Sequence, residues 1–102
     1  MVKNKKKQYS TDDLKYILQT INGDLMRIIL TEHYLQKLEH RHIDEILIDK
    51  KLLEEEPIDI KRVSHSPDDF TLTFKSDEGN ISVVVKIFNS NSLILISAVV
   101  GD

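Results

Sequence analysis

The amino-acid sequence predicts a single α+β domain in which two or three N-terminal helices pack on a three- to four-stranded antiparallel C-terminal sheet. The chain has 102 residues, which is the length of one compact domain. Apolar residues recur at helical spacing before Pro57, and after it they alternate with polar residues as in strands. Helices segregated from consecutive hairpins are typical of the α+β class.

The first helix is predicted over residues 11–22. Hydroxyl and carboxylate side chains in Ser10 to Asp13 can cap its free N–H groups, and Asn22-Gly23 can end it in a left-handed conformation. Its apolar face is formed by Leu14, Ile17, Leu18 and Ile21. The apolar run from Met26 to Leu30 is too short for a helix, so it is predicted to be a first strand or an extended linker.

One or two further helices are predicted between residues 31 and 54. Thr31 is placed to cap the first of them, and Asp44 to cap a second that ends before Pro57. The residue before a proline is pushed out of the α region, so the helical segment cannot continue through Pro57.

Antiparallel strands are predicted over residues 58–63, 70–75, 81–88 and 92–100, separated by turn-forming segments at 64–69, 76–80 and 89–91. The last two strands are nearly continuous apolar runs, so we expect them to be central and covered on both faces. The predicted core comprises Leu35, Leu38, Ile43, Leu47, Phe74, Val83, Val85 and Leu95.

Composition excludes several classes of protein. The chain has no Cys, so neither disulfides nor thiolate-bound zinc can support the fold. No apolar run approaches the ~20 residues that span a bilayer, and the Lys-rich start lacks the apolar segment of a secretory signal. A cytoplasmic location without membrane attachment is therefore expected.

Charge divides the chain into a predicted basic flexible tail, residues 1–9, and a single α+β domain, residues 10–102. The first seven residues hold four lysines and no acid, so of 14 basic residues 10 remain against 17 acidic ones, a balance of −7. A lysine tail can bind phosphate through counterion release. A short terminal lysine run is more often a solvated chain end, so the tail alone does not indicate nucleic-acid binding.

The densest polar cluster lies between residues 33 and 43. On a helix, His33, Lys37, His40 and Arg41 share one face, where they could hold a phosphate. The alternative is a solvated face whose cations pair with neighbouring carboxylates.

A zinc site formed by His33, His40 and His42 is disfavoured. His40 and His42 are two residues apart and cannot share a helical face, and the neighbouring Lys37 and Arg41 would repel a cation. His65, in a turn-rich segment, is more typical of a loop residue than of a catalyst. The sequence has no Gly-rich phosphate loop, no G-x-S-x-G motif and no Cys nucleophile. Neither a metal nor another cofactor is indicated.

The pattern His33-x-x-x-Lys37-Leu38-x-x-Arg41-x-Ile43-Asp44 resembles the helix signature H-A-x-x-R-M-x-x-R-x-[IV]-[ST]. That signature belongs to a family of small uncharacterised domains allied to the RelE/ParE toxin superfamily. The resemblance covers roughly residues 27–100. The chain departs from the signature at Tyr34, Lys37, Leu38 and Asp44, each by a chemically mild exchange.

The resemblance implies a RelE-like fold and, in active relatives, metal-independent RNA cleavage. It assigns acid–base catalysis to His33 and phosphate contacts to Lys37 and Arg41. In such an enzyme a cation from the sheet would join them to bind substrate, and Lys86 is the first choice and Arg62 the second.

Two functions follow as hypotheses. The first is a toxin-type ribonuclease of a toxin–antitoxin-like system, with RNA or an antitoxin-like protein as partner. The second is a non-catalytic RelE-like interaction module, either a homodimer or a partner-binding protein. The sequence pI of about 5.8 favours the second, because an acidic field slows the encounter with RNA.

Overall fold

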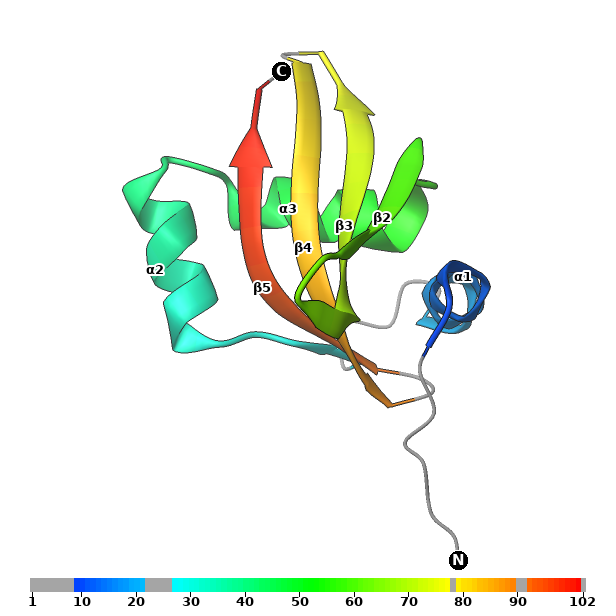
Figure 1. Ribbon diagram of the computed structural model, residues 1–102. Coiled ribbons are helices and arrows are strands. Elements are labelled where there is room, and N and C mark those ends of the chain that lie inside the picture. The colour runs from blue at the N-terminus through cyan, green and yellow to red at the C-terminus, as the bar shows by residue number, and fades with distance from the viewer. Residues whose placement is uncertain (1–8, 22–26, 78, 90–91, 102) are drawn as a thin grey trace, which may run out of the picture.

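The computed structural model describes residues 9–21, 27–77, 79–89 and 92–101, and within them it shows three helices and one five-stranded sheet (Figure 1). The helices are α1 (Thr11–Ile21), α2 (Glu32–His40) and α3 (Glu45–Glu54). The strands are β1 (Ile28–Ile29), β2 (Asp59–Val63), β3 (Ser66–Ser76), β4 (Gly79–Asn89) and β5 (Ser92–Val100). The α+β class with N-terminal helices is confirmed.

The strand order is β1-β5-β4-β3-β2. Strands β2 to β5 form the predicted antiparallel meander. Strand β1 is added at the other edge, where it pairs in parallel with β5 through Ile28–Leu93 and Ile29–Ile94. The sheet thus has five strands rather than three or four. The added strand lies within the run from Met26 to Leu30, for which the sequence predicts either a strand or an extended linker, and two residues are too few for alternation to decide between them.

Strand β3 begins earlier than predicted. Residues 66–69 were expected to belong to a turn, yet they are strand, and only Ser64 and His65 form the connection to β2. Pro67 is tolerated there because the β2–β3 register shifts between Arg62 and Val63, and an irregular ladder does not need every N–H donor.

Some predicted features lie outside the described residues. They are the tail up to residue 8, the helix end at Asn22-Gly23, Glu78 in the β3–β4 connection, and residues 90–91 in the β4–β5 connection. The start of α1 is described: Ser10 and Asp13 exchange hydrogen bonds, each accepting through its side chain from the other's backbone N–H, at 3.1 and 2.8 Å. This reciprocal arrangement is a capping box.

The predicted caps of α2 and α3 are confirmed. Thr31 and Asp44 have extended backbones and accept hydrogen bonds from the N–H groups of Tyr34 and Ile46, at 3.1 and 2.9 Å. Each cap satisfies a donor that has no partner within its own helix.

The end of α2 is a Schellman motif. The N–H of His42 donates to the carbonyl of Glu39 at 3.2 Å, and the N–H of Ile43 donates to that of Leu38 at 2.9 Å. The motif requires a left-handed residue, and His42 supplies it with φ 56° where glycine is the usual choice. The turn directs the chain into α3.

One face of the sheet carries the core, and the helices cover that face. In Figure 1, α3 lies behind the strands, α2 lies beside β5, and α1 lies on the β2 side. The inward-facing residues of β3, β4 and β5 are Phe70, Leu72, Phe74, Ile81, Val83, Val85, Ile87, Leu93, Leu95 and Ala98. The helices add Leu14, Ile17, Ile21, Tyr34, Leu38, Ile48 and Leu52.

The predicted core is confirmed for Leu38 and for the four strand residues Phe74, Val83, Val85 and Leu95, all of which are buried. Ile43 and Leu47 are partly buried against the core. The prediction for Leu35 was wrong, since this side chain is 37 % exposed while Tyr34 is fully buried. Adjacent helical residues differ by about 100° in direction, so only one of the two can face the sheet.

The other face of the sheet is not covered by any described helix. Val84, Ile94 and Ile96 point to this side and are only half-buried. The expectation that the last two strands are covered on both faces was therefore wrong. The apolar residues of β4 and β5 line two different surfaces, a dry core and an accessible sheet face.

Candidate functional site

The predicted catalytic row lies along α2. His33 and Lys37 are one helical turn apart, and Arg41 follows as the C-terminal cap residue. His33 is exposed and Lys37 is half-buried, because their row borders the stripe through Tyr34 and Leu38 that faces the core.

Arg41 has a structural contact. Its Nη1 donates a hydrogen bond of 2.8 Å to the backbone carbonyl of Ala98 in β5. Strand β1 pairs with β5 only as far as Ile94, so beyond that residue α2 lies along this edge of the sheet (Figure 1). Arg41 thus ties α2 to an edge strand that would otherwise offer its backbone to other chains.

The two sheet cations are not brought to this row. Lys86 lies between two inward-facing residues of β4, so it points to the sheet face away from the helices, and its Nζ is 3.1 Å from Oδ1 of Asp69. Arg62 is on β2, three strands from β5, or about 14 Å at the usual strand spacing. Arg62 donates to the carbonyls of Pro67 and Tyr9 and stands 5.2 Å from the centroid of the Phe70 ring.

A cleft at the α2–α3 turn contains Arg41 together with His42, but also carboxylates. Its lining includes Asp44 and Asp77, and Asp44 is engaged as the cap of α3. A phosphate placed here would meet these two carboxylates beside the guanidinium of Arg41. Among the described residues, no three His, Cys, Asp or Glu side chains are placed to hold a metal ion.

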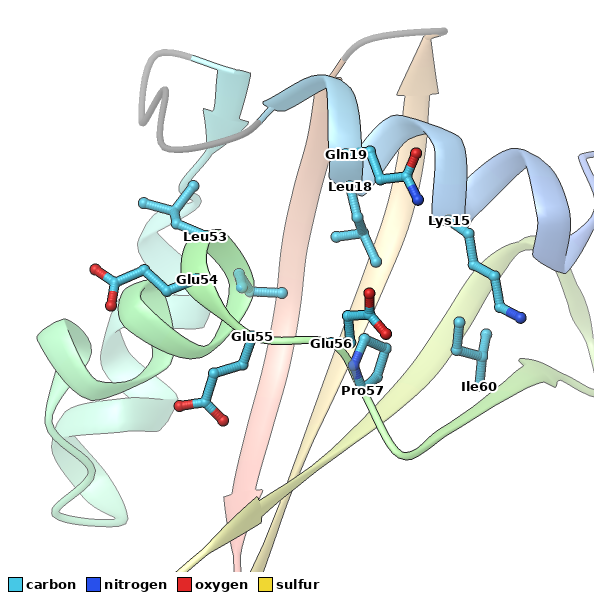
Figure 2. Close-up of a pocket in the computed structure, with 10 residues that line it drawn as sticks. Lys15, Leu18, Gln19, Leu53, Glu54, Glu55, Glu56, Pro57 and Ile60 are labelled. Carbon is cyan, nitrogen blue, oxygen red and sulfur yellow. The ribbon is translucent and has the colours of Figure 1, made fainter.

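A second concave surface lies between α1, the end of α3 and β2, and it has the larger apolar lining (Figure 2). We call it the α1–α3 groove; its volume is about 320 Å³. Its apolar lining is Leu18, Leu52, Leu53, Pro57 and Ile60. Its polar lining is Lys15, Gln19, Glu54, Glu55 and Glu56.

The local sequence explains why the groove exists. Helix α3 ends at Glu54, and Glu55 then adopts an extended conformation with φ −125° and ψ 157°. Pro57 prevents the helix from resuming. The chain therefore runs extended from the end of α3 to the start of β2. Helix α1 lies over this connection on one side only.

The rim of the groove is acidic. Glu54, Glu55 and Glu56 are all exposed, and Lys15 is the one cation among the lining residues. Glu55 is paired with Lys51, whose Nζ lies 3.0 Å from its Oε2. Figure 2 shows Glu56 projecting toward Leu18 of α1, whereas Glu54 and Glu55 point outward from the end of α3.

Sequence reasoning missed this groove. It used residues 54–57 only to end the third helix. The available signal was a run of three glutamates and a proline directly after the apolar pair Leu52-Leu53. This run can be recognised as part of a groove only when α1 and β2 are known to lie beside it.

No family model, curated protein or solved structure matches this chain. Within the described residues, no helix combines the length and hydrophobicity that crossing a bilayer requires.

Proposed function

We propose that this domain is a protein-interaction module whose α1–α3 groove binds a short segment of another protein bearing apolar and basic side chains. The observation that supports the proposal is an apolar floor joined to a rim with three glutamates and one lysine. Burial of apolar side chains supplies binding free energy at roughly 25 cal/mol per Å². The glutamates favour partners that carry Lys or Arg beside those apolar groups.

The size of the groove is consistent with such a ligand. Pockets that enclose whole small molecules occupy ~300–1,000 Å³, and this groove of about 320 Å³ is at the low end. It can accept one or two anchoring side chains of a longer segment. A nucleic acid is disfavoured, because its phosphates would meet the glutamates of the rim and an acidic domain.

The test uses the full chain and two labelled peptides in fluorescence anisotropy, one made of Leu and Lys and its counterpart made of Leu and Glu. We expect the Lys peptide to bind and the Glu peptide not to bind. Glu56→Lys should weaken binding about tenfold, or ~1.4 kcal/mol, by replacing attraction with repulsion at the groove. Glu39→Lys makes the same charge change at an exposed site on α2 and should leave the affinity unchanged.

Two results would contradict the proposal. One is that the wild-type protein binds neither peptide, or both equally. The other is that Glu56→Lys and Glu39→Lys weaken binding by the same factor, which would mean that overall charge and not the groove attracts the peptide.

A second candidate function is toxin-type, metal-independent RNA cleavage at α2, as the sequence resemblance implies. The observation in its favour is that His33 is exposed one turn from Lys37. An imidazole can exchange a proton near neutral pH, and an ammonium group can contact a phosphate. The bond of Arg41 to Ala98 and the distant positions of Lys86 and Arg62 weigh against it.

A metal-free ribonuclease assay on ribosome-bound and free RNA tests this second candidate. Cleavage that disappears in both His33→Ala and Lys37→Ala would support it. Absence of cleavage by the wild type, or cleavage untouched by both changes, would exclude it and leave the interaction module.

A further inference from the structure

The sheet face opposite the helices has an uncharged centre. Two rows of residues cross β3, β4 and β5 in register, and we call them the outer patch. The rows are Thr73–Ser82–Val99 and Thr71–Val84–Ser97. Val99 is 46 % exposed and the other five side chains are half-buried by their neighbours in the sheet.

Charged residues border this patch on two sides. Asp59 and Lys61 of β2 extend the two rows on one side, in register with Thr73 and Thr71. The Lys86–Asp69 ion pair occupies the adjacent row across β4 and β3. An uncharged centre with a charged rim is the usual anatomy of a protein–protein interface.

The side chains of the outer patch are short and similar in height. Threonine, serine and valine make a level surface, and sheets with such faces pack against each other about 10 Å apart. The six patch residues include no aromatic ring, and the exposed aromatic of β4, Phe88, lies beyond Lys86, whereas surfaces that bind single-stranded nucleic acid stack successive bases on several aromatic side chains. A sheet is therefore a better occupant of this face than RNA.

The size of the face matches what a stable dimer buries. Strands β2 to β5 span about 19 Å at ~4.8 Å per strand, and β3 to β5 have nine to eleven residues, or ~31–37 Å at ~3.4 Å each. Because β2 has only five residues, the flat area is roughly 590 Å², and the accessible area of a side-chain surface exceeds its flat projection. A standard interface buries about 800 Å² per partner.

We propose that the outer patch is a self-association surface at which a second copy of this chain packs sheet to sheet about a twofold axis. A twofold dimer uses the same patch on both copies, so the patch must complement itself. A level, uncharged centre can pack against a copy of itself. The rim contains both signs of charge, in Lys61, Lys86, Asp59 and Asp69, so it too can complement its copy. Outside the patch and this rim, the described residues carry 12 Asp and Glu against 8 Lys and Arg, and this net negative charge disfavours other pairings of two copies.

This dimer extends the proposed function without depending on it. The α1–α3 groove lies on the helical side of the sheet, so association through the opposite face leaves both grooves open. Two grooves in one particle would engage a partner that displays two binding segments far more tightly than one groove can.

Sedimentation equilibrium of the full chain tests the proposal with matched lysine substitutions. Val84→Lys places a charge in the centre of the patch and should raise the dimer dissociation constant roughly a hundredfold or more, because the twofold axis brings two unpaired ammonium groups into the interface. Ile46→Lys makes a similar change on α3 at a side chain that is 66 % exposed, and it should leave the dimer intact.

Ser97→Arg provides a second probe of the same row, and circular dichroism identifies any variant that fails to fold. If Val84→Lys does not fold, the Ser97→Arg protein decides the outcome. A wild type that stays monomeric at the highest soluble concentration would overturn the proposal. A dimer that survives in every folded patch variant as it does in Ile46→Lys would overturn it equally.

Discussion

Replacing Tyr34 by phenylalanine should stabilise the protein. Tyr34 is fully buried, and its hydroxyl has no hydrogen-bond partner among the described residues. Burial raises the pKa of this phenol, and the carboxylates of Asp49 and Glu45 on α3 raise it further. An unsatisfied buried hydroxyl costs ~1–3 kcal/mol of stability, which the substitution removes. The small cavity left by the missing oxygen atom offsets part of that gain. We therefore expect Tyr34→Phe to raise the free energy of unfolding by about 1–2 kcal/mol.

Urea unfolding at pH 7, followed by circular dichroism, measures this difference. In thermal unfolding each kcal/mol should raise Tm by ~4–8 °C for a domain of this size. Tyr16→Phe is the matched control, because Tyr16 is 67 % exposed and its hydroxyl faces solvent. A destabilised Tyr34→Phe variant would refute the reasoning, since it would show that the hydroxyl donates a hydrogen bond in solution. The buried Oδ1 of Asp49, which has no partner among the described residues, would then be the acceptor to examine.

Three further changes test other parts of the fold. Burial, and then the Glu45 carboxylate, raise the pKa of Asp49, so the folded state holds this proton more tightly and ionised Asp49 costs stability at neutral pH. Asp49→Asn should thus be more stable than wild type at pH 7, and the difference should shrink as the pH falls through the raised pKa toward ~3.9; a difference that is independent of pH would contradict this. His42→Gly should stabilise by about 1 kcal/mol in urea unfolding, because glycine adopts the φ of 56° without steric cost; a loss of stability would mean that the imidazole itself supports the fold. Leu95→Ala should lower the unfolding free energy by ~2–5 kcal/mol, since Leu95 is fully buried, and an unchanged Tm would count against a packed core at this position.

The parts of the fold that could be predicted depend on local chemistry. The caps at Thr31 and Asp44 involve donors only two or three residues away, so the sequence alone indicates them. The alternation of apolar and polar residues in β3 and β4 likewise indicates that one face of the sheet is buried and the other is accessible to solvent. The choice between Tyr34 and Leu35 could not be made this way, because both are large and the direction of α2 depends on a sheet formed sixty residues later.

The candidate site was less predictable for the same reason. Spacing places His33, Lys37 and Arg41 in one row, but it cannot reveal that Arg41 binds a carbonyl in β5. That contact spans 57 positions of sequence. The α1–α3 groove also requires three separate segments to meet, and no single segment carries its signature.

The parallel pairing of β1 with β5 has a consequence for the order of folding. Connecting residues 28 and 93 closes a loop of roughly 65 residues, at an entropic cost of about 4 kcal/mol. A strand of two residues returns only a few hydrogen bonds, each worth ~0.5–1.5 kcal/mol. The hairpins of β3, β4 and β5 are local and can form first, and β1 then docks on the finished meander. Strand β1 is short and lies at the edge of the sheet, so few hydrogen bonds oppose its detachment from the folded domain. The amide protons of this edge should therefore exchange through local opening, while those of the central strand β4 require the whole domain to unfold.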